Sequence, residues 1–128
     1  MTVYISPNPG KPMAYGISQR AAQILMAHGA KVLMQMNLRE ECNTMGVQFL
    51  PQKECLEKTD VILTIGGDGT ILHEANLSLE YHKPILGINL GRCGFLATCE
   101  VDEMEQKLSA VARHAERVVV GVARHADY

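Results

Sequence analysis

The sequence has 128 residues, enough for one domain with a buried core, and 47% of them are hydrophobic while 20% are charged. The formal net charge of -2 argues against nucleic acid or an anionic membrane surface as a partner. No apolar run approaches the roughly 20 residues that span a bilayer, and the first residues lack the pattern of a signal peptide. We therefore expect a cytoplasmic protein with a single domain over residues 1–128.

The predicted strands are short runs rich in Val and Ile that alternate with helical patterns. They cover residues 3–6, 31–36, 47–50, 61–65 and 85–89, and a further run at 118–122 is interpreted as a last strand. Continuous apolar runs of this length are typical of strands that are buried on both faces of a parallel sheet.

Three helices are predicted between and after these strands. The first has apolar residues at helical spacing and ends at Gly29, where a left-handed cap is expected. The second ends at Pro84, and the third begins near Asp102 and Glu105, which have the spacing of a capping box. The residues predicted to share one face are Ile17, Ala21, Ile24, Leu25 and His28 in the first helix, Ile71, Leu72, Ala75 and Leu79 in the second, and Met104, Leu108, Val111, Ala112 and Ala115 in the third.

Residues 37–59 have the weakest pattern, and the sequence predicts only a short helix around residues 38–42. Alternation of strands and helices elsewhere predicts a doubly wound, mostly parallel α/β fold of the Rossmann-like type. In such folds the ligand lies beyond the carboxyl ends of the strands.

Four cysteines are scattered along the chain. Cys42, Cys55, Cys93 and Cys99 include no pair at two-residue spacing, which is unlike a zinc site, and they are too few for a disulfide scaffold. We expect no metal ligands among them and interpret them as small buried residues.

The most informative segment is a buried strand that runs into Gly66, Gly67, Asp68, Gly69 and Thr70 and then into a helix. Glycines at the carboxyl end of a strand let backbone N–H groups approach a phosphate, and the positive end of the following helix favours an anion. The pattern is neither a Walker A motif nor a dinucleotide fingerprint.

Asp68 is an unfavourable neighbour for a phosphate unless it has a chemical role there. It is a candidate to accept the proton of an attacking hydroxyl or to hold magnesium. The structural alternative is that Asp68 only caps the helix that follows.

The next strand also runs into a glycine-rich loop, which carries Asn89, Arg92 and Phe95. Two loops of this kind after successive strands are expected to face each other across one crevice. A phenylalanine between glycines has few intramolecular neighbours, so stacking on a base is a natural use for it. The loop after the first strand, residues 7–12, borders the same crevice and is interpreted either as a nucleotide contact or as a rigid connection.

The two glycine motifs resemble those of known kinases. Residues 66–72 resemble the GGDGT motif shared by NAD kinases, diacylglycerol and sphingoid-base kinases, and 6-phosphofructokinases, whereas residues 87–96 resemble the NAD kinase family alone. The resemblance covers residues 1–105 and implies a transfer of phosphate from ATP, or from polyphosphate, to the 2′-hydroxyl of the adenosine ribose of NAD. It also implies Mg²⁺ as the metal ion and homo-oligomers of the full-length enzymes.

Carried over to this chain, the resemblance makes Asp68 the catalytic base and places Gly69 against the dinucleotide. Leu72 and Phe95 are then expected to line the adenine pocket, and His73 to contact NAD or phosphate. The set expected to bind substrate or nucleotide is Gly66, Gly67, Asp68, Gly69, Thr70, Leu72, His73, Asn89 and Phe95. From the residues alone, Leu72 is equally well interpreted as core and His73 as a solvated helix residue.

Known family members are about twice as long, because they have an additional β-rich domain. That second domain forms much of the NAD site. Residues 1–128 do not contain that domain or its Asn-Glu pair, so we expect this chain alone to turn over NAD poorly. The alternatives to an NAD kinase are a truncated, non-catalytic nucleotide-binding fragment and a lipid or sugar kinase that shares the GGDGT motif.

Overall fold

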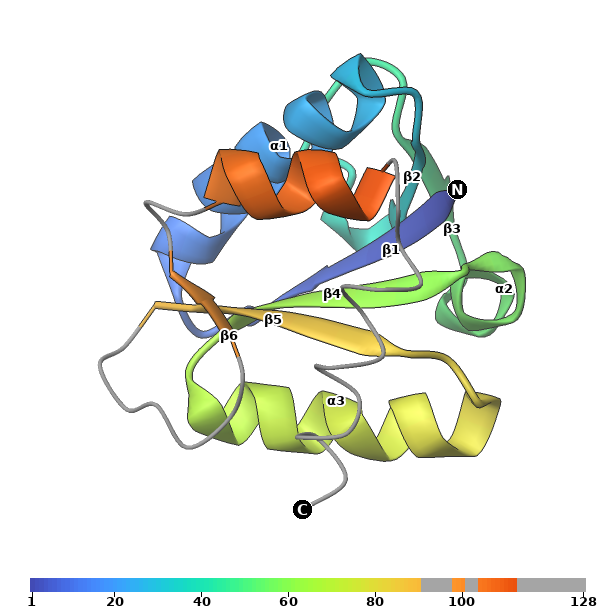
Figure 1. The fold of residues 1–128 in the computed structure, drawn as a ribbon, viewed down its shortest axis with the longest axis vertical. Coiled ribbons are helices and arrows are strands. Elements are labelled where there is room, and N and C mark those ends of the chain that lie inside the picture. Colours follow the sequence, from blue (N-terminus) through green and yellow to red (C-terminus); the bar gives the residue numbers. More distant parts are fainter. Residues whose placement is uncertain (91–97, 101–103, 113–128) are drawn as a thin grey trace.

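Within the part of the chain that the structure describes, the strands form one parallel sheet of six (Figure 1). The computed structural model describes residues 1–90, 98–100 and 104–112, and it describes the backbone alone for Asp68, Asn89 and residues 98–100. The strand order is β3-β2-β1-β4-β5-β6, and every neighbouring pair is parallel. The strands are β1 (Thr2–Pro7), β2 (Lys31–Gln35), β3 (Gln48–Leu50), β4 (Val61–Gly66), β5 (Ile85–Asn89) and β6 (Thr98–Glu100). The predicted doubly wound α/β class is confirmed.

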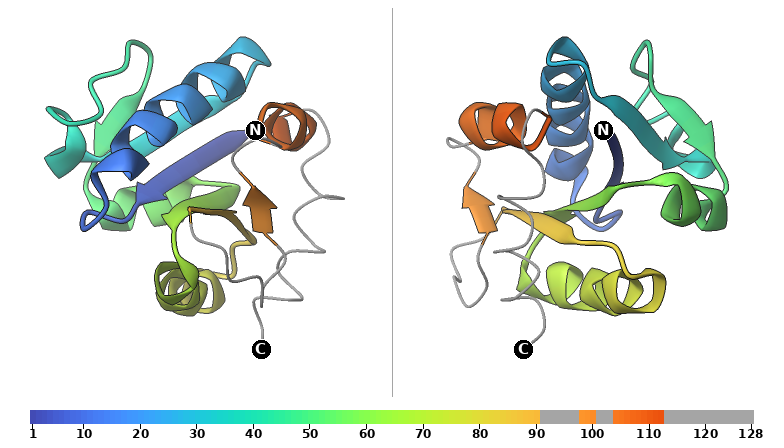
Figure 2. Two further views of the ribbon diagram at one scale, coloured as in Figure 1. Left: turned by 90° about the vertical axis from the view of Figure 1, so that its left-hand side faces the viewer. Right: turned by 45° about the vertical axis from the view of Figure 1, so that its right-hand side comes forward.

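Helices cover both faces of this sheet (Figures 1 and 2). Helix α1 (Pro12–Ala27) and a helix over residues 104–112 pack on one face, and α2 (Gln52–Lys58) and α3 (Asp68–Tyr81) pack on the other. Alternate side chains of β1, β2 and β4 enter the two apolar clusters, which explains why these strands lack a polar face. No described helix is both long enough and apolar enough to cross a membrane.

Helix α1 ends just before Gly29, as predicted, and it begins at Pro12, a start that the sequence analysis did not define. Pro12 occupies the first helical position, where a missing N–H is tolerated, and Gly29 has a φ of 90° just beyond the end. The N–H of Gly29 donates to the carbonyl oxygen of Met26 and that of Ala30 to Leu25, which closes the helix in a Schellman motif. His28 caps this helix and is exposed, so its predicted place on the buried face is wrong.

Helix α3 buries a different face from the predicted one. Ile71 and Ala75 are buried as expected, but Leu72 and Leu79 are 49% and 55% exposed. The interpretation of Leu72 as a core residue is therefore wrong. The side chains on the buried face follow the spacing i, i+3, i+4, i+7. They are Ile71, Glu74, Ala75 and Ser78.

The third predicted helix is present over residues 104–112, and Met104, Leu108 and Val111 are buried against the α1 side of the sheet. The predicted helix around residues 38–42 is wrong, because a 3₁₀ turn, η1 (Met36–Leu38), and further turns occupy that stretch. Asp102, Ala115 and the strand expected at 118–122 lie outside the described residues.

Cys42 and Cys55 are buried free thiols, as predicted from their scattered positions. Burial raises the pKa of each thiol to about 11, and the charge of Glu41 adds to the effect on Cys42. A thiol with this pKa is only about one part in a thousand thiolate at pH 8.

We expect iodoacetamide at pH 8 to leave Cys42 and Cys55 unmodified in the folded protein and to alkylate both in guanidinium. Peptide mass mapping gives the result, and rapid labelling of the folded protein would contradict it.

Candidate functional site

The site lies between β1 and β4, where the order of the strands across the sheet changes direction. Strands β1 and β4 are neighbours in the sheet, but the chain leaves them toward opposite faces, so their carboxyl ends open a crevice. The β1–β4 pairing continues past the strand end, since the N–H of Asn8 donates to the carbonyl oxygen of Ile65 at 2.8 Å. This bond fixes the loop after β1 beside the glycine loop after β4.

The turn from β4 into α3 has the features of an anion-binding site. Gly67 occupies the N-cap position and α3 begins at Asp68, with a first intrahelical bond from the N–H of Ile71 to the Gly67 carbonyl. The N–H groups that precede Ile71 have no acceptor within the helix, and the helix dipole makes this end positive. A Cβ atom built on Gly67 would lie 3.9 Å from Lys11 Nζ, so the ammonium group of Lys11 lies beside the same turn.

Most of the predicted site residues come together at this edge of the sheet. Gly66 and Asn89 are paired positions of β4 and β5, so the ends of the two strands lie side by side. Gly69, Thr70 and His73 lie in the first turns of α3. Leu72 is on the exposed side of the same helix, whereas Phe95 and Arg92 lie outside the described residues.

The backbone of α3 places Asp68 at the first helical position rather than at the N-cap. The cap position belongs to Gly67, so the purely capping interpretation of Asp68 loses its geometric basis. Its roles as proton acceptor or magnesium ligand remain predictions.

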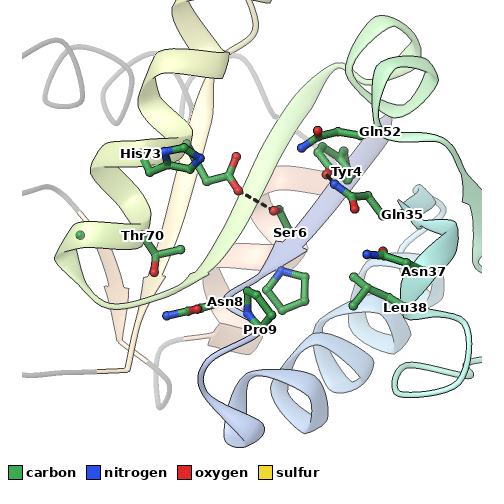
Figure 3. A pocket seen from close by; sticks show the side chains of 13 residues that line it. Tyr4, Ser6, Asn8, Pro9, Gln35, Asn37, Leu38, Gln52, Thr70 and His73 are labelled. Carbon is green, nitrogen blue, oxygen red and sulfur yellow. Dashed lines mark hydrogen bonds between the residues drawn. The ribbon is translucent and has the colours of Figure 1, made fainter.

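A polar cleft of about 460 Å³ opens next to the glycine loop, between α3 and the ends of β1 and β2 (Figure 3). The sequence analysis did not predict this cleft as a separate site, but Gly69, Thr70 and His73, which it predicted to bind substrate or nucleotide, are among the residues that line it. The cleft is lined by Tyr4, Ser6, Pro7, Asn8, Pro9, Gln35, Asn37, Leu38, Gln52, Gly69, Thr70, His73 and Glu74.

Glu74 is the acidic residue of this cleft, and its side chain is only 7% exposed. Ser6 Oγ donates a hydrogen bond of 2.7 Å to Glu74 Oε1, marked by the dashed line in Figure 3. The second carboxylate oxygen, Oε2, is buried and has no hydrogen-bond partner among the described residues. A buried carboxylate oxygen without a donor is unfavourable, and such an exception requires an explanation.

Tyr4 forms the floor of the cleft beneath the ends of Gln35 and Gln52 (Figure 3). Gln35 Nε2 donates to the phenol oxygen at 3.3 Å. Burial raises the pKa of Tyr4, the hydrogen bond from Gln35 opposes the rise, and the negative charge of Glu74 adds to it. Tyr4 is therefore a neutral hydroxyl at physiological pH.

The described residues contain no group of three or more His, Cys, Asp or Glu side chains that are placed to hold a metal ion. Magnesium that enters with a nucleotide needs only one or two carboxylates, because the phosphates and water supply its other ligands. The absence of such a group among the described residues therefore does not conflict with a magnesium ion that enters with a nucleotide.

Gly66 is required by close packing at the loop. A Cβ atom added there would lie 2.9 Å from Thr70 Cβ, an atom that cannot rotate away because it is bonded to the backbone. We expect Gly66→Ala to lower the free energy of unfolding by about 1–3 kcal/mol. Gly16 is the matched control, since a Cβ atom there meets nothing within 4 Å in the middle of α1. Gly16→Ala is expected to raise the free energy of unfolding by about 0.5–1 kcal/mol.

Urea denaturation of both variants measures these changes. A stabilised Gly66→Ala variant would show that the turn has room for a side chain.

The sequence contained one signal for the missed cleft. Thr70, His73 and Glu74 have the spacing i, i+3, i+4, so they share one face of the helix that follows the glycine loop. The cleft residues on β1, β2 and α2 have no comparable spacing in the sequence. They come together only because parallel strands that are distant in the sequence pair in the sheet.

Comparison with known proteins agrees with this geometry. A family model of the ATP-NAD kinase N-terminal domain matches residues 3–116. NAD kinase 2 of Streptomyces coelicolor is 31% identical over 134 residues, covering 97% of this chain and 44% of that protein. NAD kinase of Methanothermobacter thermautotrophicus is 39% identical over 106 residues, covering 78% of this chain and 35% of that protein.

Among solved structures, yeast NADH kinase complexed with NADH shares the fold, with a TM-score of 0.69 at 23% identity over 94% of this chain and 36% of that chain. The chain thus spans less than half the length of these relatives, between 35% and 44%.

Proposed function

Because this chain belongs to the NAD kinase family, we propose that it carries the phosphoryl-transfer site of an enzyme that phosphorylates NAD. The γ-phosphoryl group of ATP moves to the 2′-hydroxyl of the adenosine ribose, which gives NADP and ADP. The observation that carries the proposal is the turn from β4 into α3, where glycine backbone, a helix N-terminus and the Lys11 ammonium converge.

In this reaction the 2′-oxygen attacks the γ-phosphorus while the bond to the β–γ bridging oxygen breaks, and ADP leaves with the bonding electrons. Asp68 accepts the proton that the hydroxyl releases. The backbone of Gly66, Gly67, Gly69 and Thr70 surrounds the phosphates, and Lys11 offsets their charge. Magnesium enters bound to the ATP phosphates as part of the substrate.

The acceptor lies on the Leu72 side of α3. A leucine that is 49% exposed next to a phosphate site offers an apolar surface for a base. Phe95 supplies the opposing aromatic ring, and Asn89 and His73 contact NAD at the rim. These assignments follow the family motif at the matching positions of this chain.

The test is a competition among acceptors, performed on the protein as its gene encodes it. Mg·ATP labelled at the γ-position is offered together with NAD, NADH, diacylglycerol and sphingosine, and the products are separated by chromatography. We expect the label in the dinucleotide fraction. Label in a lipid would identify a lipid kinase, and no transfer with intact ATP binding would identify a non-catalytic nucleotide-binding domain. Repeating the assay with polyphosphate tests the alternative donor.

A further inference from the structure

We propose that the polar cleft between α3 and the ends of β1 and β2 binds the nucleoside of the phosphoryl donor, with Glu74 accepting a hydrogen bond from a ribose hydroxyl. This inference rests on the proposed function, because it assigns the phosphates of the same nucleotide to the adjoining glycine loop. It assigns the donor nucleoside and the acceptor NAD to different sides of α3.

The first observation is the unused hydrogen-bonding capacity of Glu74. Ser6 holds Oε1 at 2.7 Å and so fixes the carboxylate at the wall of the cleft, while Oε2 has no donor among the described residues. A carboxylate only accepts hydrogen bonds, so the missing partner is a donor. Gln52 and His73 line the same cleft with exposed side chains. A ligand hydroxyl reaches the buried Oε2 only if neighbouring side chains of the cleft move aside.

The second observation is the composition of the remaining wall. Side-chain amides are the most frequent polar groups among the lining residues, which also include a neutral phenol, Leu38 and two prolines. An amide presents one donor and one acceptor side by side, which is the pattern that pairs with the edge of adenine. The amide residues that line the cleft are Asn8, Gln35, Asn37 and Gln52.

The third observation is the order of charges along α3. Gly69 lies at the positive N-terminus near Lys11, and Glu74 lies five residues further, about 7.5 Å along the helix at the usual rise per residue. Phosphates are attracted to the first position and repelled by the second, whereas a neutral ribose meets no repulsion at Glu74. A nucleotide therefore lies along α3 with its phosphates at the loop and its nucleoside in the cleft.

The source of the nucleoside follows from the two sides of the helix. Thr70, His73 and Glu74 face the cleft, and Leu72 points to a different side, where the proposed function places the adenine of NAD. The cleft is therefore assigned to ATP rather than to NAD.

The test compares nucleotides that differ only in their ribose hydroxyls. In isothermal titration calorimetry with magnesium, the wild-type protein is expected to bind ATP about tenfold more tightly than 2′,3′-dideoxy-ATP, since a hydrogen bond to a charged group is lost. Glu74→Gln keeps an acceptor for Ser6 and removes the charge. It is expected to weaken ATP binding about tenfold and to leave the affinities for dideoxy-ATP, inorganic tripolyphosphate and NAD unchanged.

Glu80→Gln is the matched control, because Glu80 is an exposed carboxylate on the same helix and does not line the cleft. It is expected to bind every probe as the wild type does. Thermal denaturation of each variant verifies folding, and the comparison of ATP with dideoxy-ATP on the wild type decides the question even if Glu74→Gln does not fold.

Equal wild-type affinity for ATP and dideoxy-ATP, or no binding of ATP, would overturn the inference. An effect of Glu74→Gln on NAD instead of ATP would assign the cleft to the acceptor and would also overturn it. Ribose discrimination that depends on Glu74 in a protein that forms no NADP would contradict only the proposed function. NADP formation without this discrimination would contradict only the assignment of the cleft.

Discussion

Replacement of Asp68 by asparagine is expected to lower the turnover number for NAD phosphorylation by about 10²–10⁴-fold. Asparagine keeps the size and most of the hydrogen-bonding shape of the side chain but cannot take up a proton. Because the lost interaction belongs to the transition state, the affinity for NAD is expected to change little. Steady-state rates measured over a range of magnesium concentrations, together with thermal unfolding, give the result for the protein as its gene encodes it.

The same experiment separates the other roles of Asp68. A magnesium ligand would appear as a raised magnesium requirement that excess metal partly rescues. A capping role would lower the free energy of unfolding by around 1 kcal/mol and leave the rate nearly intact. The structure places Gly67 at the cap position, so we expect the rate effect and only a small change in stability. Turnover near the wild-type level would remove the catalytic assignment.

Replacement of Ile65 by alanine is expected to lower the free energy of unfolding by about 2–5 kcal/mol. Ile65 is fully buried in β4, where it packs in the apolar cluster beneath α1, and its carbonyl oxygen accepts the hydrogen bond from Asn8. Alanine leaves a cavity directly before the glycine loop, because the sheet on both sides of β4 prevents collapse. Urea denaturation measures the change.

Leu79→Ala is the matched control for this variant. It removes a side chain of the same volume from a position that is 55% exposed on α3. The expected change in the free energy of unfolding lies within about 0.5 kcal/mol. If Ile65→Ala and Leu79→Ala lowered the free energy of unfolding equally, the described burial of Ile65 in the core would be contradicted.

The sheet could be predicted from the sequence because its strands are buried on both faces. The run 61–65 has no polar alternation and ends in glycine, which leaves few interpretations other than a central parallel strand. Hydrogen-bonding geometry then places the ends of such strands at one edge. The glycine loop and Asn89 were therefore predicted together at that edge, and the pairing of Gly66 with Asn89 confirms their backbone positions.

The peripheral elements could not be predicted, because too few buried residues mark them. Helix α2 buries only Cys55 and Leu56, so it has no apolar periodicity to recognise. Strand β6 was also missed, and it has only three residues. The stretch before β3 turns in 3₁₀ geometry rather than as a helix, although the N–H of Cys42 still donates to the carbonyl of Leu38.

The cleft was missed for a different reason. A glutamate in a helix is ordinarily solvated, so apolar periodicity assigned the buried face of α3 to Leu72 and Leu79 instead of Glu74. Ser6 stabilises the buried carboxylate from β1, which lies 68 residues earlier in the chain. A hydrogen bond between residues so far apart in the sequence depends on the fold, and no local sequence pattern predicts it.

The most direct test of the central claim is product identification with unlabelled substrates. The protein as its gene encodes it is incubated with NAD and Mg·ATP. A dehydrogenase that accepts only the 2′-phosphorylated dinucleotide measures the NADP formed, and ADP is measured in parallel. We expect NADP and ADP in equal amounts. ADP without NADP, or a phosphorylated dinucleotide that the dehydrogenase rejects, would contradict the assignment of the β4–α3 crevice to transfer onto the 2′-hydroxyl of NAD.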